Sequence, residues 1–324
     1  ARRGVGASQA LYYPGDQLRL SVCTPFVEKP GLLFDFTNFE FGIANYISPT
    51  HVHGGIYGSV TPLSSSTAMV LGARLPQMMG DVLDAGAVML TGLPAAPAAV
   101  AGHSLGEYTA LVAAGAISLS DGVRLVAERG RLMQAAVPAG EGAMAAILGL
   151  EDEAVRQCCA EAAVAGVVEA VNFNAPGQVV IAGSTAAVNA AIEKLKAAGV
   201  KRALPLPVSV PSHCALMKPA AEQLQLTLEA MTFNTPAIPV VQNVAARIEA
   251  DTNAIREALV QQLYRPVLWV QCMETLAGLG VTRALECGPG KVLIGMVKRI
   301  APDVKCLTLA DKASFEAALA ELAG

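Results

Sequence analysis

Hydrophobic and polar positions follow a regular pattern from about residue 67 to the end of this 324-residue chain. Short apolar runs bounded by turn residues, typical of buried strands, alternate with longer segments that have the periodicity of amphipathic helices. Strands that alternate with helices form mostly parallel sheets with helices packed on them. The pattern therefore predicts an α/β fold. Residues 1–66 contain strand-like pieces and turn signals but no clear period, so their fold is not predicted.

The stretch between residues 139 and 207 has its own order of elements. Helices are expected over 151–163 and 184–198, the second with Ser184 as its N-cap and Gly199 as its stop. Strands are expected over 143–148, 167–173, 178–182 and 201–206. The order β-α-β-β-α-β is that of ferredoxin-like domains. We therefore expect a small ferredoxin-like domain over 139–207, inserted between residues 67–138 and 208–324 of a large α/β domain, with 1–66 as an atypical N-terminal segment.

The flanking segments predict the elements of the large domain. Ser120 is a plausible N-cap for the second helix after the first clear strand. Strands are expected over 97–102, 238–243 and 283–286, and helices over 82–90, 107–114, 120–134, 217–230, 254–263, 270–279 and from about 292.

Composition narrows the class of protein. Hydrophobic residues make up 53% of the chain and charged residues only 15%, against a usual value of about 25%. The net charge of −4 gives no indication of a nucleic-acid or anionic-membrane partner. The most apolar stretch, 85–102, is broken by glycine and proline, so we expect no membrane segment. Seven scattered cysteines without a C-x-x-C pair favour a reducing, cytoplasmic location, and no metal site is expected.

A G-x-S-x-G motif at residues 102–106 carries the first candidate chemistry. A predicted buried strand precedes it and a predicted helix follows, which is the context of a nucleophile elbow. Such a turn exposes the Ser104 oxygen, and the helix N–H groups, that of Leu105 in particular, would stabilise an oxyanion. A glycine-rich turn with a capping serine is the simpler alternative.

A serine nucleophile needs a base. Of the four histidines, His103 lies inside the motif, where the geometry of its neighbour points it away from that role. His213 ends an extended segment and precedes a helix, so it is either the base or a buried, satisfied side chain.

Arg129 stands out by its place on the predicted helix 120–134. It falls on the apolar arc formed by residues such as Leu125 and Met133, away from the polar face. A guanidinium directed inward requires an anionic partner, because an unpaired buried charge is costly. That partner is either an internal carboxylate or the carboxylate of a substrate held by two hydrogen bonds.

These residues belong to a series of motifs between about residue 98 and residue 300. The motifs occupy residues 102–108, 128–134, 172–174 with 176–183, 206–217, 262–264 with 266, and 286 with 288–293. In this order they resemble the acyltransferase family, which includes the malonyl-CoA:acyl-carrier-protein transacylases of bacterial fatty-acid synthesis and the acyltransferase domains of polyketide synthases. The resemblance implies a hydrolase-like α/β large domain with a ferredoxin-like insert.

The resemblance also implies roles for individual residues. Ser104 matches the nucleophile, His213 its base, and Arg129 the group that binds the malonyl carboxylate. Gln262 matches the residue whose backbone carbonyl orients the catalytic histidine, and Asn174 a polar residue that lines the cleft from the small domain.

At its N-terminus the chain departs from the family pattern. The family's G-Q-G-S-Q motif, whose last glutamine supplies a second oxyanion donor, is absent. The nearest trace of this motif ends at Gln17, which is the candidate for the second oxyanion donor. Nine of the fifteen aromatic residues lie in residues 1–60, so this segment looks foreign to the family.

The implied reaction moves a malonyl group from malonyl-CoA to the phosphopantetheine thiol of acyl carrier protein through a malonyl-serine. The implied substrates are coenzyme A thioesters, no metal or redox cofactor is needed, and a monomer is the family's usual state. A serine hydrolase of the α/β-hydrolase type and an inactive acyltransferase-like binding module are the alternatives. The predicted insert and the apolar-face Arg129 oppose the hydrolase.

Overall fold

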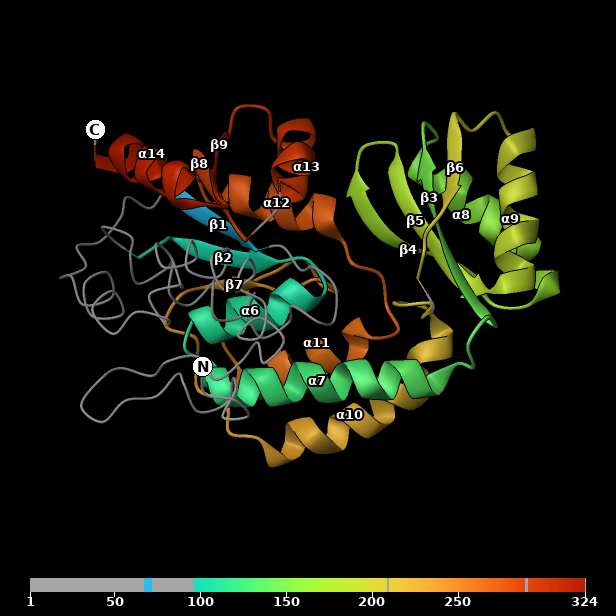
Figure 1. Cartoon of the computed structure of the whole chain (residues 1–324), viewed down its shortest axis with the longest axis horizontal. Helices are drawn as coiled ribbons and strands as arrows, with labels where there is room; N and C mark the ends of the chain where they lie inside the picture. The colour runs from blue at the N-terminus through green and yellow to red at the C-terminus, as the bar shows by residue number, and fades with distance from the viewer. Residues whose placement is uncertain (1–66, 72–95, 209, 289–290, 324) are drawn as a thin grey trace, which may run out of the picture.

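Two separate β-sheets organise the chain in the computed structural model, which describes residues 67–71, 96–208, 210–288 and 291–323 (Figure 1). One sheet is built from segments on either side of residues 142–205, and the other lies within them. The expectations for residues 1–66, including Gln17, and for a helix over 82–90 lie outside the described residues.

The larger sheet has the strand order β7-β2-β1-β8-β9, and all of its pairings are parallel. Its strands are β1 (Thr67–Leu71), β2 (Ala99–Gly102), β7 (Val240–Val241), β8 (Arg283–Cys287) and β9 (Lys305–Leu309). The helices around it are α6 (Leu105–Ala113), α7 (Leu119–Ala136), α10 (Lys218–Ala230), α11 (Thr252–Gln262), α12 (Trp269–Gly278), α13 (Val292–Ile300) and α14 (Lys312–Ala323). The predicted α/β class with a mostly parallel sheet is confirmed.

The core of this part lies on both faces of the sheet. Successive residues of β2 point to opposite faces, as the two-residue period of a strand requires. Val100 therefore packs in a cluster with α6, α7, α10 and α11, whereas Ala99 and Ala101 pack in a second cluster with α12 and α13. Because both faces of β2 are buried, the sequence here is continuously apolar rather than alternating.

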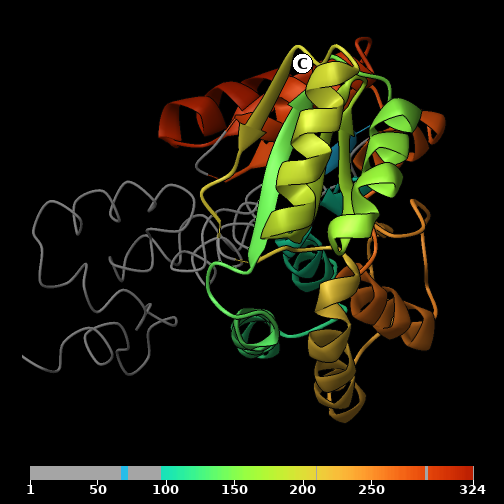
Figure 2. The same ribbon diagram turned by 90° about the vertical axis from the view of Figure 1, so that its right-hand side faces the viewer.

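The smaller sheet has the strand order β4-β5-β3-β6 and antiparallel pairings. Its strands are β3 (Gly142–Leu148), β4 (Val168–Ala175), β5 (Gln178–Ser184) and β6 (Arg202–Pro205). Helices α8 (Asp152–Ala162) and α9 (Thr185–Ala197) pack together on its outer face (Figure 2). The chain order β-α-β-β-α-β is the predicted one.

Backbone hydrogen bonds tie the smaller sheet to the larger part. The amide of Phe173 in β4 donates to the carbonyl of Val267, 3.0 Å away, and the amide of Val267 donates to the carbonyl of Val171, 2.9 Å away. Arg299 of α13 also donates to the carbonyl of Pro176 in the β4–β5 turn and to Oε1 of Gln178, the first residue of β5. These contacts fix the end of β4 beside α13 and beside the segment that leads into α12.

Several predicted element ends were wrong by a few residues. The cap of α7 is Ser118, not Ser120, because the Ser118 hydroxyl accepts the amide hydrogen of Asp121 and donates to the carboxylate of Asp121. Ser184 precedes α9 in an extended conformation but its side chain makes no capping bond. Gly199 follows α9 with a φ of +85°, as its predicted role as a stop requires.

Gly102 should tolerate no side chain, because β2 turns into α6 within two residues. A Cβ atom added there would lie 1.9 Å from the carbonyl carbon of Gly106. We expect Gly102→Ala to lower the free energy of unfolding by at least about 3 kcal/mol, since backbone must move to relieve the overlap. Urea denaturation measures this. Gly278→Ala is the control, because no atom lies within 4 Å of its added Cβ. Equal stability of the two variants would contradict the close approach.

Candidate active site

The turn between β2 and α6 places Ser104 in a strained conformation. Its φ is 53° and its ψ is −106°, a region that residues with a side chain rarely adopt. The turn is held from the neighbouring strand end, where Oδ1 of Asn243 accepts the Ser104 amide hydrogen at 2.7 Å. The Nδ2 group of Asn243 donates to the carbonyl of Gly102, also at 2.7 Å. The sequence prediction of a nucleophile elbow agrees with this strand–turn–helix geometry.

The hydroxyl of Ser104 lies within hydrogen-bond distance of His213. The distance between Ser104 Oγ and His213 Nε2 is 2.7 Å, and Nδ1 of His213 lies 2.6 Å from the backbone carbonyl oxygen of Gln262. A carbonyl oxygen only accepts hydrogen bonds, so Nδ1 must carry the hydrogen. Nε2 is then the acceptor for the Ser104 hydroxyl. This is the relation between a nucleophile and its general base.

Burial keeps His213 in its neutral form. Removal from water is the main reason, and the positive charge of Arg129 the second, that the pKa of His213 falls to about 3. The imidazole is therefore uncharged near neutral pH, with Nε2 free to accept a proton. The backbone of His213 adopts a φ of 68°, and its amide donates to the carbonyl of Leu263 at 2.9 Å.

Arg129 lies against Ser104 rather than in a closed ion pair. The side chain is only 7% exposed. Its Nη2 group donates to Oγ of Ser104 at 3.2 Å and to Oε1 of Gln262 at 3.3 Å, and its guanidinium carbon lies 5.4 Å from the centre of the Tyr108 ring. Among the described residues, no carboxylate pairs with it. A buried positive charge without a direct salt-bridge partner in the described part of the chain thus lies next to the serine oxygen.

The remaining predicted residues lie at different distances from Ser104. Leu105 is the first residue of α6, so its amide has no acceptor within the helix. Asn174, in β4, is buried and its Oδ1 accepts from Nε2 of His103 at 2.8 Å, so it contacts the residue before the nucleophile. The structure therefore brings Ser104, His213, Arg129 and Gln262 into contact with one another. Asn174 contacts His103, the residue next to Ser104.

Two residues of this cluster were not predicted. Asn243 lies at the end of a predicted strand, at the carboxyl edge of a parallel sheet, and that position is a usable signal for a functional polar residue. Glu107 looks like an ordinary acidic residue in a helix's first turn, where it complements the helix dipole. Only the tertiary structure shows that Glu107 is fully buried and accepts hydrogen bonds from the backbone amide of Asn243 and from the side chain of Gln262.

Known proteins are similar in sequence to most of this chain. The model of the acyl transferase domain family matches residues 85–300. The malonyl CoA-acyl carrier protein transacylase of Escherichia coli K12 is 57% identical over 224 residues, which are 69% of this chain and 72% of that protein. The same-named protein of Bacillus subtilis is 47% identical over 227 residues, 70% of this chain and 72% of that protein.

The chain belongs to the acyltransferase family.

Solved structures of family members have the same fold. The malonyl-CoA:acyl carrier protein transacylase of Xanthomonas oryzae superposes with a TM-score of 0.77 at 43% identity, covering 80% of this chain and 99% of that one. A malonyl-transacylase in complex with a type II polyketide-synthase acyl-carrier protein gives a TM-score of 0.76 at 42% identity, covering 79% and 99%. The family predicted from the sequence motifs is confirmed.

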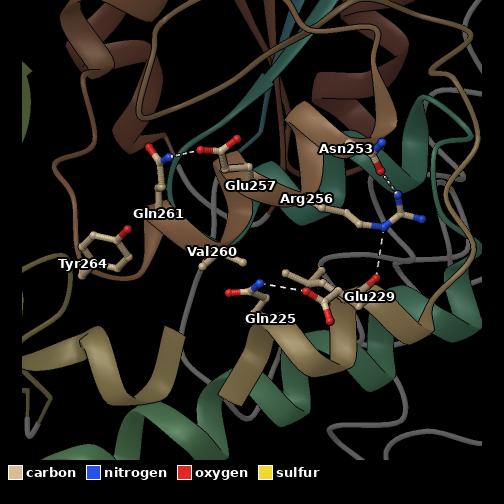
Figure 3. A pocket seen from close by; sticks show the side chains of 9 residues that line it. Gln225, Glu229, Asn253, Arg256, Glu257, Val260, Gln261 and Tyr264 are labelled. Atoms are coloured by element: carbon tan, nitrogen blue, oxygen red, sulfur yellow. Dashed lines mark hydrogen bonds between the residues drawn. The ribbon is translucent and has the colours of Figure 1, made fainter. Parts of the chain in front are cut away.

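A hollow of about 480 Å³ between α10 and α11 is separate from the acyltransferase site (Figure 3). It contains none of the predicted site residues, and its polar side chains pair with each other, Gln225 with Glu229 and Gln261 with Glu257. In the described ranges no helix is long and apolar enough to cross a membrane, and no group of three or more His, Cys, Asp or Glu side chains is placed to hold a metal ion.

The neutral state of His213 should make stability depend on pH. Its pKa of about 3 lies below the ordinary 6.5, so at pH 5 the unfolded chain binds a proton that the folded chain does not. As the pH falls from 7 to 5, this group should reduce the free energy of unfolding by about 2 kcal/mol. His213→Asn should remove this loss, and Asn also tolerates the positive φ.

Urea denaturation of both proteins at pH 7 and pH 5 measures the difference. Burial raises the pKa of Glu107 to about 7, so that group acts in the opposite direction, but it is present in both proteins and cancels. The same drop in stability in wild type and variant would show that His213 is not buried in its neutral form.

Proposed function

We propose that this protein transfers a malonyl group from malonyl-CoA to the phosphopantetheine thiol of acyl carrier protein, through a malonyl-serine on Ser104. The observation that supports this most strongly is the buried, unpaired guanidinium of Arg129, 3.2 Å from the oxygen that His213 activates. A serine and its base suit acyl transfer in general. A fixed positive charge beside them selects an acyl group that ends in a carboxylate.

In the first half-reaction, Ser104 attacks the thioester carbonyl carbon of malonyl-CoA. The hydroxyl proton passes to Nε2 of His213 as the Oγ–C bond forms. The negative charge that develops on the carbonyl oxygen is stabilised by the amide of Leu105, at the N-terminus of α6. The tetrahedral intermediate then expels the coenzyme A thiolate, which takes the proton from His213, leaving malonyl-Ser104.

In the second half-reaction the carrier thiol takes the place of coenzyme A. His213 accepts the thiol proton, the sulfur attacks the malonyl carbonyl carbon, and the Ser104 oxygen leaves and is protonated by His213. The backbone carbonyl of Gln262 holds the imidazole in the same orientation in both halves. The names of the relatives and the neighbouring complex with an acyl-carrier protein support this choice of acceptor.

Arg129 distinguishes this reading from an ordinary esterase. A neutral ester has no group to pair with a buried guanidinium, which would then remain uncompensated at a cost. A malonyl carboxylate supplies two acceptor oxygens in the geometry that guanidinium donors match. Binding there also aligns the thioester with Ser104.

The organisation of the chain around this reaction is also a proposal. Residues 139–207 form the small ferredoxin-like domain and residues 67–138 with 208–324 the large one, with Asn174 reaching the cleft from the small domain. The enzyme acts as a cytoplasmic monomer, for which light scattering after size-exclusion chromatography is the test.

Ser104→Ala should abolish covalent labelling by radioactive malonyl-CoA while the fold stays intact, because one hydroxyl on a turn is removed without loss of core volume. Intact-mass spectrometry after incubation measures the label. Ser120→Ala, at an exposed site at the start of α7, is the control and should label as wild type does. Label on the Ser104→Ala protein would remove Ser104 from the mechanism. Wild type that releases free malonate instead would indicate a hydrolase, and wild type without label an inactive binding module.

Arg129→Ala should change substrate choice more than reactivity. We expect kcat/KM for malonyl-CoA to fall about 100-fold, since a charge-assisted bidentate contact contributes about 1.5–3 kcal/mol. Acetyl-CoA has no carboxylate, so its kcat/KM should stay constant or rise. Arg131→Ala is the matched control, because Arg131 is exposed on the same helix and paired with Glu128. An equal loss for both substrates in Arg129→Ala would assign Arg129 a structural role.

A further inference from the structure

Glu107 is a fully buried carboxylate that the reaction itself does not use. It lies three residues after Ser104, in the first turn of α6, and faces away from the serine oxygen toward α11. Its Oε2 atom accepts from the Asn243 amide at 3.2 Å and from Nε2 of Gln262 at 2.6 Å. Burying a carboxylate costs free energy, which the hydrogen bonds around Glu107 offset.

The side chain of Gln262 connects Glu107 to the two groups that meet the substrate. Its Nε2 group donates to Glu107 and also to the backbone carbonyl of Ser104, 2.9 Å away. Its Oε1 atom accepts from Nη2 of Arg129 at 3.3 Å. The side-chain amide of Gln262 thus contacts the turn at Ser104, the guanidinium of Arg129 and the carboxylate of Glu107. The backbone carbonyl of Gln262 holds His213.

These partners permit only one orientation of the amide. Turning it by 180° would place Oε1 against a carboxylate oxygen and a carbonyl oxygen, neither of which can donate, and would place the NH₂ group against a guanidinium that cannot accept. The ionised Glu107, together with the Ser104 carbonyl, therefore directs the amide oxygen of Gln262 toward Arg129. The Nη2 group of Arg129 is held beside Ser104 by that oxygen.

We propose that Glu107 is a positioning residue for substrate selectivity: through the Gln262 amide it fixes the Arg129 guanidinium at the place where the malonyl carboxylate binds. The proposal rests on the proposed function, because it assigns Glu107 a share in the selectivity that Arg129 provides. It separates selectivity from base catalysis, since His213 is held by the backbone of Gln262 and not by its amide.

A double-mutant cycle tests the route through Gln262. Glu107→Gln keeps the shape but removes the negative charge that binds the Nε2 group of Gln262, so the amide is held less firmly against Arg129. Gln262→Met removes the amide and keeps the backbone carbonyl that orients His213. Each change should lower kcat/KM for malonyl-CoA about tenfold, the effect of one charge-assisted hydrogen bond, mainly through KM. In Glu107→Gln the value for acetyl-CoA should stay within about twofold, because acetyl-CoA has no carboxylate to bind Arg129.

The double variant should resemble either single variant, because both changes interrupt the same contact. An equal loss of kcat/KM for malonyl-CoA and acetyl-CoA in Glu107→Gln would show that Glu107 has a structural role only. If the losses of the two single variants multiply in the double variant, Glu107 and Gln262 act independently. Either result overturns the proposal. Glu274→Gln, exposed on α12, is the charge-matched control. A wild type that never acquires malonyl label refutes the proposed function itself, whereas a wild type that does, with an unaffected Glu107→Gln variant, refutes only this inference.

Nuclear magnetic resonance of wild type tests the same contact if Glu107→Gln does not fold. With ¹⁵N-glutamine labelling, the Gln262 side-chain signal is the one missing from Gln262→Met. The other groups facing Glu107 are Arg129, whose charge is fixed, Tyr108, whose burial raises its pKa to about 12, and the Cys272 thiol, whose pKa is also raised. The Gln262 signal should therefore move with a midpoint near the Glu107 pKa of about 7. A signal that stays constant between pH 5.5 and 8.5 would overturn the proposal.

Discussion

The hydrogen bond between Nδ1 of His213 and the backbone carbonyl of Gln262 decides which imidazole nitrogen faces Ser104. A carbonyl carries no full negative charge, so it orients the ring without drawing a proton onto it as a carboxylate would. Together with burial and the nearby guanidinium, this leaves a neutral base at the serine. The position of α11, whose last residue is Gln262, is therefore a requirement of the site.

Backbone atoms supply much of the precision of this arrangement. The amide of His213 is bound by the carbonyl of Leu263, and the amide of Ser104 by the side chain of Asn243. Both Ser104 and His213 have positive φ values, so both are held in conformations that isolated residues avoid. Two strained residues are thus joined by one hydrogen bond. The packing of the surrounding core, rather than the backbone preferences of these two residues, therefore determines their conformation.

Most of the fold could be predicted from the sequence, because the hydrophobic positions follow the helix and strand periods clearly. Ser104 was predicted as a candidate from its strand–turn–helix context and Arg129 from its place on an apolar arc. The roles of His213 and Gln262 were implied only by the resemblance to the family. Ser120 was predicted as the cap of α7, but only the bond between Ser118 and Asp121 shows that the helix begins two residues earlier. Glu107 and Asn243 were missed because their roles arise from contacts across more than 130 positions in the chain. The last strand, β9, and α14 were not predicted either.

The chain enters and leaves the smaller sheet at nearly the same point. A Cβ atom on Gly142, at the start of β3, would lie 2.4 Å from the ring of Pro211, two residues before His213. The intervening segment is thus a loop whose ends already meet, and the entropic cost of closing such a loop grows only slowly with its length. Insertions or deletions within this loop would leave the spacing of Ser104, Arg129 and His213 almost unchanged. The smaller sheet is therefore free to diverge in evolution while the spacing of these three residues is preserved.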